Sequence, residues 1–142
     1  MNNLICVGAV VLVFLHLLAC SKTSPTQVET DSIYGQWAWQ FSIGGISGRD
    51  TLTPTRVGFT RRVQFSQDGL FQEFRNDSLF GISQFTITRE RTIFSPDSLQ
   101  VIHFQDSVRF QAQVLWTVSR DSLVLGDIHV EPYGHYFTRI SD

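Results

Sequence analysis

The sequence predicts an all-β fold, an antiparallel up-and-down meander of about eight short strands that closes into a barrel. The clearest strand is residues 108–118, where every even-numbered position is apolar and most odd-numbered positions are polar. This alternation is typical of a strand with one buried and one solvated face. From residue 33 onward no window of helical period exceeds two turns. A two-layer β-sandwich of the same strands is the rival architecture.

The remaining strands are shorter and are separated by turn residues. Segments 62–66 and 70–74 flank Asp68-Gly69, which predicts a hairpin with positive φ at both turn positions. Further strands are expected at residues 81–88, 99–104, 123–125 and 136–140, with turn clusters at 75–78, 95–98, 119–122 and 131–134. Closing such a sheet removes its edges, and an eight-stranded barrel is either filled by side chains or holds one small ligand.

The N-terminal segment reads as an export signal. Residues 4–15 are all apolar or glycine, a run too short to span a bilayer. Leu17-Leu18-Ala19-Cys20 resembles the lipobox of bacterial lipoproteins. The resemblance implies cleavage before Cys20, a diacylglyceryl group on its thiol and an acyl chain such as palmitate on its new amine. We expect a signal peptide at 1–19, a lipidated flexible tether at 20–31 and one domain at 32–142. The alternative is an ordinary signal in which Cys20 is incidental.

Composition limits what the domain can bind. The chain has two cysteines, Cys6 and Cys20, so the expected mature domain has no thiol for a disulfide or a zinc site. Its net charge is −2, and its Lys and Arg residues are scattered. We therefore expect no nucleic-acid partner, no metal and no other cofactor.

Several motifs in order resemble one family. Gly35-Gln36-Trp37 looks like the Gly-x-Trp signature of lipocalins, and Arg139 occupies the place of the arginine that packs across that tryptophan. The ordered set resembles the small lipocalin-like lipoproteins of gram-negative bacteria over residues 33–141, through the segments 34–39, 44–45, 48, 53–54, 65–69 and 133–139. The resemblance implies a lipocalin-like barrel tethered to an envelope membrane. Independently, a guanidinium over an indole gains about 0.5–2 kcal/mol, so we interpret Trp37 and Arg139 as structural.

No catalytic constellation is visible in the sequence. His103, His129 and His135 show no metal-ligand spacing, and no Gly-x-Ser-x-Gly elbow is present. His129 and His135 lie near Asp127 and Glu131, but hydrogen-bonded or solvated loop histidines are the simpler interpretation. We expect no enzymatic activity.

Asp followed by Ser or Thr and then an aliphatic residue occurs six times. Turn hydrogen bonding explains the pattern without further assumptions. The triplet also resembles an O-glycosylation sequon of one group of gram-negative bacteria. The candidate acceptors are Ser32, Thr51, Ser78, Ser98, Ser107 and Ser122.

Two functions remain open. The leading hypothesis is a lipid-anchored module, sorted to the outer membrane, that binds a small apolar or amphipathic ligand in its barrel. Its candidate cavity-lining residues are Val108, Phe110, Ala112, Val114, Trp116 and Val118. The alternative is an envelope protein–protein interaction module with a filled barrel, such as an inhibitor or accessory subunit. It would use the outer faces of the barrel or the rim loops at residues 44–55 and 131–134, and an exposed apolar patch on those loops would favour it.

Overall fold

The computed structural model describes residues 32–93 and 95–141, of which 62% lie in strands and 4% in helix. The predicted signal peptide, Cys20 and the whole of the predicted tether at 20–31 lie outside these residues. The elements in chain order are β1 (Gly35–Gly44), β2 (Asp50–Leu52), α1 (Pro54–Val57), β3 (Arg61–Phe65), β4 (Leu70–Arg75), β5 (Ser78–Thr92), β6 (Ser95–Phe104), β7 (Gln113–Val118), β8 (Ser122–Asp127) and β9 (Tyr133–Arg139).

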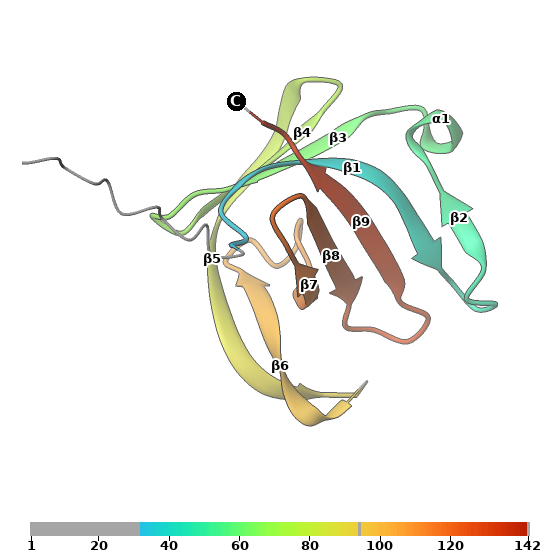
Figure 1. The fold of residues 1–142 in the computed structure, drawn as a ribbon, viewed down its shortest axis with the longest axis vertical. Coiled ribbons are helices and arrows are strands. Elements are labelled where there is room, and N and C mark those ends of the chain that lie inside the picture. The colour runs from blue at the N-terminus through green and yellow to red at the C-terminus, as the bar shows by residue number, and fades with distance from the viewer. Residues whose placement is uncertain (1–31, 94, 142) are drawn as a thin grey trace, which may run out of the picture.

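The strands form a closed antiparallel barrel of eight strands with one extra strand. The sheet runs β2-β1-β3-β4-β5-β6-β7-β8-β9, and β9 pairs back onto β1, so β1 and β3–β9 make the barrel. Figure 1 shows β9 lying beside β1. The extra strand β2 pairs with the end of β1 through Ser42↔Leu52. The predicted barrel is confirmed, and the sandwich is excluded because the sheet closes on itself.

Aromatic rings fill much of the barrel interior. The Phe71 ring centroid lies 5.0 Å from that of Phe65, 4.7 Å from that of Phe104 and 5.0 Å from that of Phe110. These tilted and edge-on contacts are the arrangements that aromatic quadrupoles favour. The core cluster also contains Ile33, Trp37, Trp39, Val63, Phe85, Ile102, Leu123, Leu125 and Phe137.

The prediction of one continuous strand over residues 108–118 is wrong. β7 begins at Gln113, and Asp106 and Phe110 close a turn before it, with the Phe110 amide donating to the Asp106 carbonyl at 2.9 Å. A β-bulge between Leu115 and Thr117 then shifts the register. The predicted parity already fails at Val114, before the bulge, and the one-residue shift returns Val118 to the core side of the strand.

The faces of β7 follow from its pairing with β8. Leu115 pairs with Leu125 and packs on the core cluster, whereas Val114 pairs with Gly126 and lies outside that cluster although it is fully buried. Trp116 is 42% exposed, and its ring lies where Cβ atoms on Gly126 and Gly134 would sit. Trp116 therefore covers the outside of β8 and β9 instead of lining the interior.

The turns agree in part with the prediction. Segments 62–66 and 70–74 do form a hairpin, but its loop is Ser66–Gly69 and only Gly69 has positive φ, at 82°. The tight turn with two positive φ angles is Asn76-Asp77, at 46° and 62°. The expected turn at 95–98 is wrong, because those residues belong to β6.

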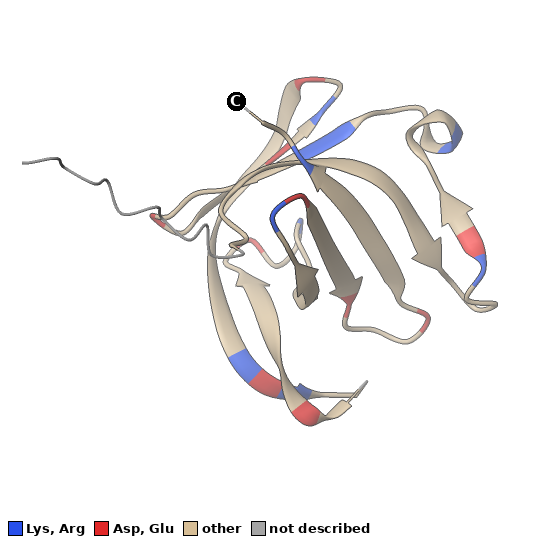
Figure 2. Ribbon diagram, in the orientation of Figure 1, with Lys and Arg blue, Asp and Glu red and all other residues tan. Residues whose placement is uncertain are grey.

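Charge is distributed around the barrel without a face of one sign among the described residues, as Figure 2 shows. No helix in the described part of the chain is both long and apolar enough to cross a membrane.

Candidate functional site

One end of the barrel contains a cavity of about 320 Å³. We call this the open end, and we call the end that contains Trp37 and Arg139 the closed end. The apolar part of the cavity lining consists of the rings of Trp39, Phe59, Phe71, Phe104 and Phe110 together with Leu52 and Val57. Its polar part consists of Ser42, Arg61, Glu73, Arg75, Arg109, Gln111, Gln113, Asp127, His129 and His135. Pockets of about 300–1,000 Å³ with apolar walls and a few convergent polar groups are typical of small-molecule sites.

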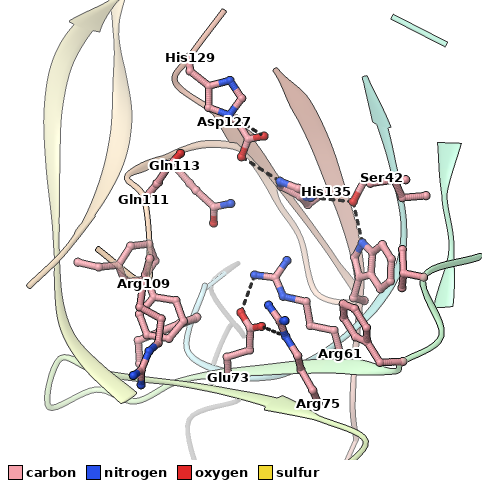
Figure 3. Close-up of a pocket in the computed structure, with 17 residues that line it drawn as sticks. Ser42, Arg61, Glu73, Arg75, Arg109, Gln111, Gln113, Asp127, His129 and His135 are labelled. Atoms are coloured by element: carbon pink, nitrogen blue, oxygen red, sulfur yellow. Dashed lines mark hydrogen bonds and ion pairs between the residues drawn. The ribbon is translucent and has the colours of Figure 1, made fainter. Parts of the chain in front are cut away.

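A buried carboxylate between two arginines lies at the bottom of this cavity. Glu73 is 2% exposed, and its Oε1 lies 2.8 Å from Arg75 Nε while its Oε2 lies 2.9 Å from Arg61 Nη2. Figure 3 shows the Glu73 carboxylate joined by a dashed line to each of the two guanidinium groups. Breaking a fully buried ion pair costs about 3–5 kcal/mol, and the partial exposure of Arg61 and Arg75, at 18% and 38%, reduces that cost here. The three charges therefore act as one unit.

The two arginines differ in how well their donors are satisfied. The Arg75 guanidinium carbon lies 3.6 Å from the Phe80 ring centroid and 4.7 Å from that of Phe59, so both rings contact it. Arg61 is directed toward the middle of the cavity in Figure 3, and its Nε is buried without a hydrogen-bond partner. Among the residues that the structure describes, Glu73 is the one charged partner of Arg61. A buried donor left unsatisfied costs about 1–3 kcal/mol.

A chain of hydrogen bonds forms another wall of the cavity. Asp127 Oδ1 lies 2.9 Å from His135 Nε2, His135 Nδ1 lies 2.7 Å from Ser42 Oγ, and Trp39 Nε1 donates to Ser42 Oγ at 2.9 Å. With neutral His135 protonated on Nε2, every group in the chain has a partner, since the Ser42 hydroxyl then donates to Nδ1. Protonation of Nδ1 would instead make Ser42 Oγ accept twice and free its own proton for the cavity.

The carboxyl of Asp127 is held in its charged form. Burial alone would raise its pKa, but the hydrogen bond and charge of His135, the amide of Tyr133 and the charge of His129 together lower the pKa below its usual value. The Tyr133 amide donates to Asp127 Oδ2 at 3.1 Å. Asp127 is therefore an anchor for His135, which in turn orients Ser42.

Ser42 enters the cavity because β1 contains a bulge. Trp37 and Trp39 point inward at a spacing of two, and the register shift between Trp39 and Phe41 makes Ser42 the next buried residue. Phe41 lies on the outer surface, where its ring stacks on Tyr136 with centroids 4.6 Å apart. The bulge thus replaces an aromatic residue by a hydroxyl in the cavity wall.

The extra strand and the short helix supply the remaining wall. Thr53 caps α1, since Arg56 N donates to Thr53 Oγ1 at 3.3 Å, and Gly58 ends the helix with φ of 79°. Asp50 holds this segment to β9, because its Oδ2 accepts from Tyr133 Oη at 2.8 Å and its Oδ1 lies 2.6 Å from Arg56 Nη1. The Tyr133 hydroxyl, followed by Arg56, lowers the pKa of Asp50, and the same hydrogen bond raises the pKa of Tyr133.

The closed end brings together the residues of the Gly-x-Trp signature. The Arg139 guanidinium carbon lies 4.0 Å from the Trp37 ring, and its nitrogens donate to the carbonyls of Ser32, Tyr34 and Arg120. Trp37 is fully buried, and its Nε1 donates to the Ile33 carbonyl at 2.7 Å. Gly35 has φ of 124°, and a Cβ there would lie 2.7 Å from Arg139 Nη1, which explains the glycine physically.

Of the six residues predicted to line a cavity, the structure places Phe110 in the cavity wall. Val108 is 96% exposed and Trp116 lies on the outer surface, so both predictions are wrong. Val114 is fully buried outside the core cluster, and Val118 packs against that cluster. Ala112 precedes β7 and is half-buried. The turn at Asp106–Phe110 and the non-strand residues between it and Gln113 account for the misplaced residues.

The histidines separate into three environments. His103 Nε2 lies 3.2 Å from Glu90 Oε1 on the outside of the β5–β6 hairpin, and His129 is half-exposed at the rim of the cavity. His135 belongs to β9 and not to a loop, and it faces the cavity. Within residues 32–93 and 95–141, no group of three His, Cys, Asp or Glu side chains is arranged to hold a metal ion.

The candidate glycosylation sites differ in access. Thr51, Ser78, Ser98 and Ser107 are exposed, whereas Ser32 and Ser122 are half-buried. The Ser122 hydroxyl lies 2.7 Å from that of Ser119 within a turn, as the turn explanation predicts.

Sequence reasoning did not single out Glu73, Arg61 or Ser42. The signal for Glu73 was present, because Phe71, Glu73 and Arg75 follow a spacing of two and all line the cavity. The inward position of Ser42 depends on a β-bulge in β1, and no pattern in the sequence predicts that bulge.

Comparison of the chain with protein-family models, with curated proteins and with solved structures found no match.

Proposed function

We propose that the domain is a non-enzymatic binding module that holds a small amphipathic molecule in the cavity at the open end of the barrel. The observation that carries the proposal is the cavity itself, which places the rings of Phe71, Phe104 and Phe110 opposite charged and hydrogen-bonding groups. Its volume is about 320 Å³, equal to the liquid volume of roughly ten waters. A ligand with an apolar body and one polar group matches this lining.

The hydrogen-bond chain supports binding over catalysis. Asp127, His135 and Ser42 are the residue types of a nucleophilic triad, but Ser42 is 1% exposed and its Oγ already accepts the Trp39 N–H. A serine nucleophile must approach a bound carbonyl closely while a base takes its proton. A buried serine that is held by an indole is better suited to fix the wall of a binding site.

The sequence supports a membrane location for this module. The lipobox-like residues 17–20 predict lipid attachment at Cys20, and Ser21 is compatible with sorting to the outer membrane. Several acyl chains, each contributing about 0.8 kcal/mol per buried CH₂, would hold the barrel at the membrane surface.

Native mass spectrometry of the full chain tests the binding proposal. We expect a retained molecule of small mass, and we expect Gln113→Trp to abolish its retention because Gln113 points into the cavity in Figure 3. Thr117→Trp, on the exposed side of β7, is the matched control and should retain the molecule. Equal retention by both variants would place the ligand elsewhere.

A specific observation favours an envelope protein–protein module as the second candidate. Ile46 is 87% exposed and Val130 is 79% exposed. Both line one hollow between the rim loops at residues 44–55 and 131–134. Exposed apolar side chains that share a hollow are typical of interaction sites.

Cross-linking in the producing cell distinguishes the two candidates. A partner of this rim predicts a defined cross-linked species that disappears when Ile46 and Val130 are both changed to Ser, while the Gln113→Trp variant still forms it. A species that persists in the double Ser variant would rule out the rim as the interface.

A further inference from the structure

We propose that the ligand of this cavity carries a single negative charge, a carboxylate that binds the guanidinium of Arg61. This inference rests on the proposed binding function and specifies the chemical class of the ligand. It follows from the charges at the open end, from the unsatisfied state of Arg61 and from the apolar surface beside it.

The charges at the bottom of the cavity do not cancel. Glu73 is one carboxylate between the guanidiniums of Arg61 and Arg75, so this cluster has one positive charge in excess. Arg109 adds a third guanidinium to the lining, but its Nε lies 3.8 Å from Asp106 Oδ2. An excess charge in a site shielded from water favours a counter-charge. The excess therefore favours an anion at Arg61 and Arg75.

Arg61 is the group best placed to bind that anion. Arg75 is held by Glu73 and by the rings of Phe59 and Phe80, whereas Arg61 has an ion pair on Nη2 and a buried Nε without a partner. The Arg61 guanidinium is directed toward the middle of the cavity in Figure 3. A planar guanidinium matches a planar carboxylate through two parallel hydrogen bonds. A small shift of the side chain would expose Nε to such a ligand.

The remaining lining limits the charge of the ligand to one. Asp127 faces the same cavity, and its lowered pKa keeps it ionised. Together with Glu73 it would repel the second charge of a phosphate dianion. A monocarboxylate with its head at Arg61 keeps its charge away from Asp127 and places its body against Phe71, Phe104 and Phe110.

Isothermal titration of the full chain with three matched probes tests the inference. The probes are 4-phenylbutyrate, 4-phenylbutanol and 4-phenylbutylamine, which share one apolar body and differ in the charge of the head group. We expect the carboxylate to bind about tenfold more tightly than the alcohol, since a hydrogen bond to a charged group adds at least the equivalent of one decade. The amine should bind more weakly than the alcohol.

Arg61→Met is the decisive variant, because it removes the guanidinium and leaves Glu73 paired with Arg75. We expect it to lose the tenfold preference for the carboxylate and to bind the alcohol within about twofold of the original protein. Arg62→Met is the matched control, since Arg62 stacks on Phe74 with its guanidinium 3.8 Å from the ring and hydrogen-bonds Gln36.

The outcomes separate the two proposals. If the alcohol or the amine binds as tightly as the carboxylate, or if Arg61→Met retains the preference, the cavity binds a ligand but the inference of a carboxylate is wrong. If none of the three probes binds the original protein, the proposed function fails, and the inference fails with it.

Discussion

The two ends of the barrel are built from the same strands, and each contains an arginine near an aromatic ring. At the closed end, Arg139 lies 4.0 Å from the Trp37 ring and donates to three backbone carbonyls. At the open end, Arg61 lies 5.5 Å from the Phe137 ring centroid and has Glu73 as its charged partner. The first guanidinium is satisfied by the fold, whereas the second retains unused donors.

This difference separates a structural arginine from a binding arginine. The backbone carbonyls that accept from Arg139 are fixed by the fold, so the donors of Arg139 stay occupied and these hydrogen bonds stabilise the closed end. Glu73 must be shared with Arg75, so Arg61 keeps hydrogen-bonding capacity in a site partly shielded from water. The same residue type therefore closes one end of the barrel and leaves the other end able to bind.

Truncation at the closed end should have the largest effect on stability. Trp37→Ala removes a fully buried indole and leaves Arg139 without its ring, so we expect a loss of about 4 kcal/mol in the free energy of unfolding. Urea denaturation measures the loss. Trp116→Ala is the matched control, because Trp116 is 42% exposed on the outer surface, and it should cost about half as much, about 2 kcal/mol. Equal losses would mean that the closed end does not anchor the fold.

Removal of the buried carboxylate at the open end should have the next largest effect. Glu73→Gln leaves the guanidiniums of Arg61 and Arg75, whose side chains are 18% and 38% exposed, without their counter-charge, and we expect a loss of about 2 kcal/mol. Adding Arg61→Met to this variant should restore part of the loss, because one uncompensated charge is then removed. Glu90→Gln, a half-exposed glutamate beside His103, is the control and should change stability by less than about 1 kcal/mol.

We attribute the instability of Glu73→Gln to excess positive charge and not to lost packing. If the double variant is no more stable than Glu73→Gln alone, this interpretation is wrong.

The closed end could be predicted from the sequence to a large extent. The alternation of apolar and polar residues, together with the turn residues, predicted the strands. The Gly-x-Trp motif and the attraction between a guanidinium and an indole predicted that Arg139 packs across Trp37. These inferences depend on local patterns, since the parity of a strand and the conformation of a glycine are determined within short sequence segments. The hairpin between β3 and β4 follows the same logic, although its loop is longer than predicted.

The open end could not be predicted because it depends on irregularities. The bulge in β1 brings Ser42 inward, against the parity that alternation implies. In β7 that parity is already reversed at Val114, before the bulge, so Trp116 lies outside, and the bulge returns Val118 to the core side. His135 and Asp127 meet Ser42 across three strands, a contact that depends on barrel closure and not on spacing within one segment. Of the cavity residues that the sequence analysis missed, Glu73 could have been found through its spacing of two from Phe71.

Acid should weaken the open end through Asp127. Its pKa is lowered in the folded protein, so the carboxylate stabilises the fold above its unfolded pKa, and this contribution is lost as the pH falls through the folded pKa. We expect the difference in stability between the original protein and Asp127→Asn to shrink as the pH falls below about 4. Urea midpoints above and below this pH measure it. A difference that grows on acidification would contradict the assigned sign.

The smallest effect is expected where the extra strand meets the barrel. Tyr133→Phe removes the hydroxyl that donates to Asp50 Oδ2, while Arg56 still holds Oδ1. Because these groups lie at the surface, we expect no measurable change in the urea midpoint. We expect faster hydrogen exchange at the Val57 amide, which donates to the Thr53 carbonyl, and unchanged exchange in β3. Faster exchange at both Val57 and β3 would mean that Tyr133 supports the barrel itself. Faster exchange at Val57 alone would show that the wall formed by β2 and α1 can open while the closed end stays intact.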